Sequence, residues 1–358
     1  MVSLVIGGSG TMGRRLVAAL SRDGEEVVAT FRRPAALPAL DGVTWRRLAL
    51  EKFTHWDELL RGVDTVYHLA WSTIPSTAAL DPAGDIQQNL VGTIRLLEAA
   101  RKRAGIRVVF ASTGGAIYGP LKQLPIGEDQ VAEPLSLYGL SKLTAERYIQ
   151  NYQVNHALDA IALRIGNCYG PSQSTEKGLG AVTLFARAAL RHEPITIYGS
   201  GEVVRDYIHV DDVVAALRAV GAKRRTRGPV NIGCGVGHSL NDIVRTLRDV
   251  TGLAVEVQYA AHRPFDVAAS VLDIQKARAQ FDWAPTIDLS QGIADVVAEL
   301  RSEMSARCAS PSTSTAISPS TFSAPKPIPA ASPANFRRLD TRPSSLPRHS
   351  PASLGKTR

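Results

Sequence analysis

The fold class is decided by residues 2–13, which read Val2-Ser3-Leu4-Val5-Ile6-Gly7-Gly8-Ser9-Gly10-Thr11-Met12-Gly13. Residues 2–6 form a short, mainly apolar run bounded by glycine, which is typical of a buried parallel strand. The segment 12–21 then carries apolar side chains at helical spacing, namely Met12, Leu16, Val17 and Leu20. The sequence therefore predicts a strand, a glycine-rich turn and a helix in direct succession.

The glycines of this turn form a G-x-x-G-x-x-G loop between the strand and the helix. Glycine is needed where a turn requires positive φ and where the backbone must approach a pyrophosphate closely. The start of a helix offers free N–H groups and the positive end of its dipole to phosphates. This context favours dinucleotide binding over a plain glycine turn. The predicted cofactor-binding residues of the loop are Gly7, Ser9, Gly10, Thr11, Met12 and Gly13.

The end of the second predicted strand bears on which dinucleotide is bound. An acidic residue usually stands there and binds the adenosine ribose, but here Phe31 takes that place and Arg32 and Arg33 follow. A pair of guanidinium groups suits a 2′-phosphate, which favours NADP over NAD. The alternative is that both arginines are merely solvated at a strand end, so the predicted cofactor is NAD or NADP.

Strands and helices alternate up to about residue 165. Strands are predicted at 26–31, 64–69, 107–111 and 160–164, and helices at 86–102 and 136–152. This alternation predicts an α/β fold, a Rossmann-type doubly wound parallel sheet. Later segments are shorter and richer in turns, as in a smaller lobe. The predicted domains are a dinucleotide-binding domain at 1–165, a mainly substrate-binding lobe at 166–303 with some segments returning to the core, and a disordered Ser/Pro-rich basic tail at 304–358.

Composition excludes several classes of protein. The chain has 358 residues, of which 44% are hydrophobic and 21% charged, an ordinary globular balance. The net charge of +8 is local, because residues 307–358 hold eight of the 41 basic and one of the 33 acidic residues. The other 306 residues therefore carry only +1, so nucleic-acid binding is not expected.

The distribution of apolar and cysteine residues predicts a cytoplasmic protein. No apolar run is long enough to span a membrane, and the first residues lack the pattern of a secretory signal. The chain has three cysteines, Cys168, Cys234 and Cys308, without pairwise metal spacing. This sparse, odd number argues against a disulfide framework and fits a reducing compartment. No metal site is predicted.

Tyr138 and Lys142 form a Y-x-x-x-K pair near the start of a predicted helix. Spacing i, i+4 puts both side chains on one helix face. A nearby ammonium and an oxidised nicotinamide both favour the phenolate, so such a tyrosine can act as an acid–base near neutral pH. The lysine can also hold the nicotinamide ribose. An isolated pair of this kind is common by chance, and its neighbours give it meaning.

With the glycine loop and the segments Asp64–Ala70 and Asn89–Thr93, the chain resembles the extended short-chain dehydrogenase/reductases. Within them it is most similar to the NAD-dependent epimerase/dehydratase group, over roughly residues 1 to 300. The resemblance implies that Tyr138 is the catalytic base, Lys142 its partner, and a Ser or Thr hydroxyl a third member. Gly114 occupies the usual place of that hydroxyl, so Thr113 or Ser112 must supply it, and Thr113 is preferred. Gly114 and Gly115 also replace the Asp-Glu pair of the 4,6-dehydratases, which disfavours that reaction.

The same resemblance assigns further residues to the cleft. The segment after the strand at 64–69 would line the cofactor, through Leu69, Ala70, Trp71 and Asn89. Convergent arginines suit the two charges of a nucleoside diphosphate. The predicted substrate-binding residues are Ser72, Tyr118, Asn167, Arg205, Arg263 and Asp266, with Tyr118 as a wall of the cleft. His68 is expected to be packed and hydrogen-bonded, and Asp211 and Asp212 to cap a helix.

These observations predict a nucleotide-sugar 4-epimerase that keeps an oxidised nicotinamide cofactor tightly bound and acts through a 4-keto intermediate. By resemblance alone, UDP-glucose and UDP-galactose are the default substrates. The alternatives are an NADPH-dependent reductase of a 4-keto nucleotide sugar, motivated by Arg32 and Arg33, and a non-enzymatic dinucleotide-binding scaffold. The family often forms dimers through two helices per subunit, so a homodimer through residues 86–102 and 136–152 is expected.

Overall fold

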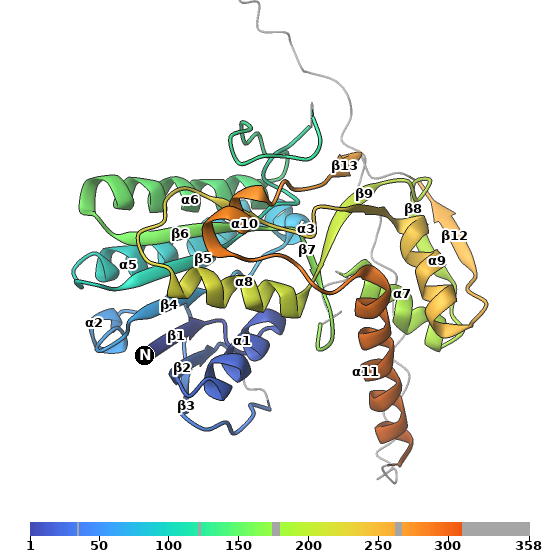
Figure 1. The fold of residues 1–358 in the computed structure, drawn as a ribbon, viewed down its shortest axis with the longest axis horizontal. Coiled ribbons are helices and arrows are strands. Elements are labelled where there is room, and N and C mark those ends of the chain that lie inside the picture. The colour runs from blue at the N-terminus through green and yellow to red at the C-terminus, as the bar shows by residue number, and fades with distance from the viewer. Residues whose placement is uncertain (34–35, 121–122, 174–179, 262–266, 310–358) are drawn as a thin grey trace, which may run out of the picture. The chain divides into compact units, whose positions relative to one another are not determined.

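Seven parallel strands form the central sheet, in the order β10-β6-β5-β4-β1-β2-β3 (Figure 1). Their bounds are β1 Val2–Ile6, β2 Glu26–Phe31, β3 Val43–Arg47, β4 Thr65–His68, β5 Arg107–Thr113, β6 Asp159–Ile165 and β10 Val230–Ile232. The strand β1 pairs with β2 on one side and β4 on the other. The order in which successive strands are added across the sheet therefore reverses at β1, although all strands stay parallel. In such sheets ligands bind outside the carboxyl ends of the strands, at this reversal.

The computed structural model describes residues 1–33, 36–120, 123–173, 180–261 and 267–309, all within one compact unit, Met1–Ser310. Two of the predicted substrate-binding residues, Arg263 and Asp266, lie outside the described residues. Most of the predicted tail, from residue 310 onward, lies outside them as well.

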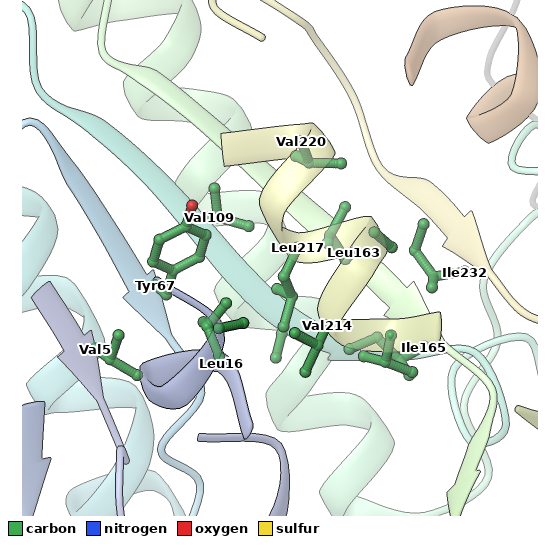
Figure 2. Packing of buried hydrophobic residues seen from close by; sticks show 14 of the residues in the cluster. Val5, Leu16, Tyr67, Val109, Leu163, Ile165, Val214, Leu217, Val220 and Ile232 are labelled. Atoms are coloured by element: carbon green, nitrogen blue, oxygen red, sulfur yellow. The ribbon is translucent and has the colours of Figure 1, made fainter. Parts of the chain in front are cut away.

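Helices cover both faces of the sheet because strand side chains alternate between the faces. On one face α1 (Thr11–Arg22) and α8 (Val210–Ala222) pack on Val5 and Val109, as Figure 2 shows. On the other face α5 (Val91–Ala100) and α6 (Leu137–His156) pack on Leu4 and Val108. The predicted Rossmann-type doubly wound sheet is confirmed.

A second group of elements follows β6. β9 (Val204–His209) pairs with β7 (Asn167–Tyr169), β11 (Gly237–Ser239) and β13 (Ala269–Ser270), and β8 (Ile195–Tyr198) pairs with β12 (Val257–Ala260). Around them α7 (Ala181–Leu190), α9 (Leu240–Thr251) and α11 (Leu289–Ala309) share a separate hydrophobic core. Within the same stretch, α8, β10 and α10 (Gln275–Phe281) return to the central sheet.

Several predicted elements differ in detail. The helix predicted at 86–102 is instead a π-helical segment η1 (Ile86–Leu90) followed by α5, and the short helices α3 (Pro75–Leu80) and α4 (Pro82–Asp85) precede them. The strand β3 was not predicted, because it is largely exposed and lacks an apolar run. The helix α2 (Trp56–Leu59) was not predicted either, because four residues are too few to show a helical period. The helix cap predicted at Asp211 and Asp212 is wrong: His209 caps α8 by accepting the N–H of Asp211.

Among the helices of the described residues, none combines the length and apolarity that crossing a membrane requires.

Candidate active site

The glycine loop lies at the carboxyl end of β1 and forms a cradle with no room for a side chain at Gly7 or Gly13. Gly7 has φ +90°, and its amide donates to the Thr30 hydroxyl at 3.0 Å. A Cβ on Gly13 would lie 2.1 Å from the carbonyl oxygen of Gly7, so α1 can pack this close to β1 only with glycine there. Gly10 begins α1 without a side-chain cap, which leaves the first-turn amides of α1 to an outside acceptor. This cradle fits a dinucleotide pyrophosphate.

The remaining loop residues lie around this cradle. The Ser9 amide bonds the carbonyl oxygen of Thr30 at 3.3 Å, and Met12 packs against the core beneath α1. The hydroxyl of Thr11 donates to the carbonyl oxygen of Ser172 at 3.2 Å. The hydrogen bonds of Gly7 and Ser9 to Thr30 therefore hold the glycine loop against the end of β2.

The end of β2 carries the two predicted arginines. Arg32 Nη2 lies 3.7 Å from Glu51 Oε1, and the Arg32 side chain is about half exposed. Arg33 is exposed. The ion pair gives Arg32 a protein partner, while Arg33 faces solvent at the edge of the sheet.

Tyr138 and Lys142 lie on the first turns of α6, which Ser136 caps by accepting the amide of Gly139. Lys142 is buried, and its Nζ donates to the carbonyl oxygen of Ala111 at 2.6 Å. The ammonium lies 4.0 Å above the Trp71 ring and 6.0 Å from the Tyr138 ring centroid. The predicted pair therefore converges beside the end of β5, against Trp71 from the loop after β4.

Burial shifts the pKa of both groups. It lowers the pKa of Lys142 to about 7, although Glu146 and Asp85 act in the opposite direction. It raises the pKa of Tyr138 to about 12, with a further rise from Asp85 and a partial offset from the hydrogen bond with Thr113. Tyr138 is therefore protonated at neutral pH in the protein alone, and an added positive charge nearby would favour its phenolate.

The two candidate hydroxyls on β5 point to different partners. The hydroxyl of Thr113 lies close enough to Tyr138 to lower the pKa of its phenol. The Ser112 hydroxyl donates to Glu146 Oε1 instead, and Glu146 also accepts from Arg164 at 2.8 Å. Successive residues of a strand face opposite sides, which explains the split. The structure thus brings Thr113, and not Ser112, to the tyrosine.

Asn89 anchors the loop after β4. Its Oδ1 accepts the Ser72 amide at 2.7 Å and the Ser72 hydroxyl at 3.0 Å, so both residues are engaged with each other. Leu69 and Ala70 begin this loop, and a Cβ on Gly7 would lie 2.9 Å from the Ala70 amide nitrogen. The loop predicted to line the cofactor therefore lies directly against the glycine loop.

His68 is packed and hydrogen-bonded, as predicted. Its Nε2 lies 2.9 Å from the Thr93 hydroxyl, and its ring contacts that of Phe110. Burial, and then Lys142, lower the pKa of His68 to about 3, so the ring is neutral at physiological pH. A neutral, enclosed imidazole of this kind serves packing rather than proton transfer.

Sequence reasoning missed Asp85. This carboxylate is buried and accepts hydrogen bonds from Ser141 at 2.5 Å, from Asn89 at 2.9 Å and from Thr73. It therefore links the loop after β4 to α6, between Tyr138 and Lys142. The only signal in the sequence was the i, i+4 spacing of Asp85 and Asn89. In the structure the π-helical segment η1 directs Asn89 toward the loop after β4.

The predicted substrate residues are dispersed. Tyr118 is buried, its hydroxyl donates to Asn231 at 2.6 Å, and the Arg164 guanidinium stacks on its ring at 4.8 Å. Asn167 begins β7, where its Oδ1 would lie 2.8 Å from a Cβ on Gly115. Arg205 on β9 donates to the carbonyl oxygen of Val267 at 2.7 Å. Contact of Tyr118 with substrate stays a prediction, since its hydroxyl already has a protein partner.

Comparison with known proteins agrees with this geometry. Residues 3–233 match the model of the NAD dependent epimerase/dehydratase family. The UDP-glucose 4-epimerase of Mycolicibacterium smegmatis is 32% identical over 313 residues, which cover 85% of this chain and 99% of that protein. The crystal structure of UDP-glucose 4-epimerase from Thermotoga maritima with UDP-glucose superposes with a TM-score of 0.80, at 32% identity, covering 85% of this chain and all of that one.

Further relatives include an epimerase solved with NAD and a reductase. A structure of Thermus thermophilus UDP-glucose 4-epimerase in complex with NAD has a TM-score of 0.78 and 33% identity, over 84% of this chain and 99% of that one. The dTDP-4-dehydro-6-deoxyglucose reductase of Escherichia coli is 27% identical over 307 residues, covering 83% of this chain and 97% of that protein. The match to the family model and the full-length relatives agree with the glycine loop and the Tyr138–Lys142 pair. The chain is therefore an enzyme that belongs to the NAD-dependent epimerase/dehydratase family.

Proposed function

We propose that the protein is a nucleotide-sugar 4-epimerase that retains an oxidised nicotinamide dinucleotide, with UDP-glucose and UDP-galactose as the first substrates to test. The observation that carries the proposal is the convergence of Tyr138, Lys142 and Thr113 at the same sheet edge as the glycine loop. Similarity to UDP-glucose 4-epimerases over more than four fifths of the chain supports the choice of reaction.

Each member of this group has a role that follows from its chemistry. Tyr138 takes the proton of the sugar 4-hydroxyl, and Thr113 hydrogen-bonds the same oxygen. Lys142, held by the carbonyl of Ala111, binds the nicotinamide ribose and supplies positive charge in its protonated form. The dinucleotide, when bound, supplies the chemistry of accepting a hydride from C4 and returning it to the opposite face of the 4-keto sugar.

The high pKa of Tyr138 fits a base that works only in the loaded enzyme. At a pKa of about 12 the phenol of the protein alone keeps its proton at neutral pH. Oxidised nicotinamide carries a positive charge, which lowers the pKa of a neighbouring phenol. Proton removal from the sugar is therefore coupled to the presence of the oxidised cofactor.

We propose that the cradle of Gly7, Gly10 and Gly13 holds the pyrophosphate, with Ser9, Thr11 and Met12 around it. The ion pair of Arg32 with Glu51 supports NAD, because it occupies one of the two guanidinium groups that a 2′-phosphate would use. Exposed Arg33 supports NADP. Leu69, Ala70 and Trp71 would line the nicotinamide side, with Asn89 holding their loop in place.

We propose that Arg205 and Arg263 hold the diphosphate of the substrate, and that Asn167 and Asp266 bind its neighbouring groups. These roles follow from the family resemblance. Ser72 would face the sugar. The part of the chain after residue 165 would then act mainly as the substrate lobe. We also propose that the enzyme works as a homodimer in the cytoplasm, and the free thiols of Cys168 and Cys234 are compatible with that reducing compartment.

A second candidate is an NADPH-dependent reductase of a 4-keto nucleotide sugar. The absence of an acidic residue at the end of β2, where Phe31 precedes Arg32 and Arg33, favours it. Such an enzyme would consume NADPH as a dissociable co-substrate. An epimerase recycles its cofactor in place and shows no net consumption.

The deciding experiment is to denature freshly purified protein and identify the released dinucleotide by chromatography and mass, alongside an assay of UDP-glucose and UDP-galactose interconversion. Retained NAD with interconversion supports the epimerase. An empty site that binds NADPH more tightly than NADH, with NADPH turnover on a 4-keto sugar, overturns it in favour of the reductase. A Tyr138→Phe protein serves as the inactive control.

A further inference from the structure

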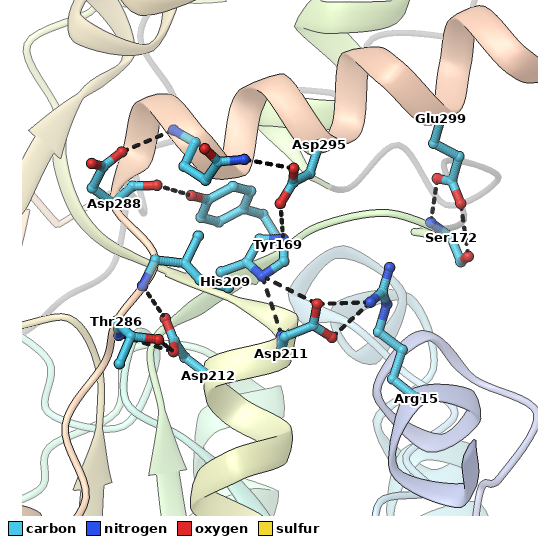
Figure 3. Close-up of polar contacts among 12 residues, drawn as sticks. Arg15, Tyr169, Ser172, His209, Asp211, Asp212, Thr286, Asp288, Asp295 and Glu299 are labelled. Carbon is cyan, nitrogen blue, oxygen red and sulfur yellow. Dashed lines mark hydrogen bonds and ion pairs between the residues drawn. The ribbon is translucent and has the colours of Figure 1, made fainter. Parts of the chain in front are cut away.

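Two carboxylates one turn apart on α11, Asp295 and Glu299, lie on the side of the helix that faces α1 (Figure 3). Glu299 accepts two hydrogen bonds from Ser172, from its amide at 2.5 Å and from its hydroxyl at 2.9 Å. The carbonyl oxygen of Ser172 in turn accepts the hydroxyl of Thr11. Ser172 has φ +65°, a left-handed conformation that is strained for a non-glycine residue, so Glu299 helps to hold it there.

A second link runs parallel to the first. His209 is buried, and its Nδ1 accepts the amide of Asp211 at 3.3 Å. Burial lowers the pKa of His209 despite the opposing effects of Asp211, Asp295 and Asp212, and Arg15 lowers it further. The neutral ring therefore carries its hydrogen on Nε2, which faces Asp295 Oδ2 at 3.9 Å, an electrostatic contact beyond hydrogen-bond distance. The carboxylate of Asp211 accepts from Arg15 Nη1 at 2.7 and 2.8 Å.

Both links end on the helix that follows the glycine loop. Thr11 and Arg15 are one turn apart at the start of α1, as Asp295 and Glu299 are on α11. The first-turn amides of α1 point where the helix axis directs them. Gly13 packs α1 directly against Gly7 and Gly8, so the position of the helix is tied to that of the glycine loop. The other side of α11 packs in the hydrophobic core shared with α7 and α9. The links therefore connect that core to the phosphate end of α1.

We propose that Asp295 and Glu299 are positioning residues for the dinucleotide, which hold the start of α1 through Ser172 and through His209 and Asp211. The inference rests on the proposed function, since the ligand is the nicotinamide dinucleotide. It goes further in assigning part of the cofactor affinity to a helix far along the chain from the glycine loop. Linkage makes the effect reciprocal: if α11 strengthens cofactor binding, bound cofactor stabilises the docking of α11.

The test compares the full-length wild type with Asp295→Asn, Glu299→Gln and the double variant. The matched control is Glu303→Gln, an exposed glutamate one turn further along α11. We expect the double variant to bind NAD about tenfold more weakly in titration calorimetry of cofactor-free protein, because the hydrogen bonds of Glu299 to Ser172 and the negative charge of Asp295 facing His209 are both lost. The KM for cofactor should rise more than kcat falls, and the control should match the wild type.

Hydrogen exchange gives a second readout that needs no variant. NAD should slow the exchange of the amides of residues 293–303 in the wild type, and less so in the double variant. The inference is overturned if the double variant binds NAD within twofold of the wild type, or if NAD leaves exchange in α11 unchanged. A wild type that binds neither NAD nor NADP overturns the proposed function as well, which separates the two failures.

Discussion

Tyr138 is the residue whose removal isolates the proposed chemistry. We expect Tyr138→Phe to lower kcat for UDP-sugar interconversion by about 10²- to 10⁴-fold, the usual contribution of a positioned acid–base group. The stability of the fold should change little, since the ring stays in place. The control is Tyr148→Phe, an exposed tyrosine on the same helix. Initial rates decide it, and an active Tyr138→Phe enzyme would remove this residue from the mechanism.

Lys142 makes a prediction about the pH dependence of stability. Its pKa is about 7 in the folded protein and 10.5 in a free lysine, so between these values the unfolded chain binds more protons. The wild type therefore gains stability relative to Lys142→Met as pH rises from 7 toward 10, by about 2 kcal/mol between pH 7 and 9. Below pH 7 the difference should be flat. Urea denaturation of both proteins at four pH values measures this, and a difference independent of pH contradicts it.

The residues that sequence reasoning identified are those whose role depends on near neighbours. The glycine loop and the Tyr138–Lys142 spacing are local patterns, and the structure brings both to one sheet edge. Asp85 and Glu146 escaped notice because their environment comes from segments 34 to 56 residues away, through Ser112 and Ser141. Burial of a lone carboxylate is a tertiary property that no local pattern reveals.

At the scale of the element, η1 shows where periodicity fails. The apolar stripe of residues 86–102 fits one regular helix, yet the structure widens it over Ile86–Leu90. The wider turn replaces regular α-helical hydrogen bonds, and Asn89 within it bonds to Ser72 and Asp85. π-Helical turns occur frequently at functional sites. Hydrophobic spacing predicts that a helix exists, but not that one turn is enlarged for a polar contact.

Asn89 is expected to be the key residue of this element. Asn89→Ala removes the hydrogen bonds of Asn89 to Ser72 and one of the three side-chain hydrogen bonds that the Asp85 carboxylate accepts, which should cost about 1 to 3 kcal/mol of unfolding free energy. It should also weaken cofactor retention, because the loop after β4 lies against the glycine loop. Gln87→Ala, an exposed neighbour, is the control. Equal urea midpoints for the two variants would show that Asn89 is not holding the loop.

For the whole molecule, the sheet was predictable and the later part of the chain less so. The parallel sheet follows from apolar runs alternating with helices, because each crossover is short and local. The segments after residue 165 are short strands whose partners lie far apart, such as β13 with β9 and β10 with β6. Their pairing depends on tertiary packing, so sequence reasoning predicted a smaller lobe there and the return of some segments to the core, but not which strands pair.

The outer surface of α6 supports the predicted homodimer. Leu137, Leu140 and Tyr148 lie on one stripe of the helix with 41%, 50% and 39% of their surface exposed, although each is large and hydrophobic. Packing this stripe against a second copy would bury it. Leu140→Glu should therefore convert the proposed dimer to a monomer in light scattering, since the interface would have to bury an unpaired carboxylate from each subunit. The control is Val236→Glu, which is also exposed and apolar in the wild type but lies outside α6. A monomeric wild type, or a Leu140→Glu protein that remains dimeric, would show that this stripe is not the dimer interface.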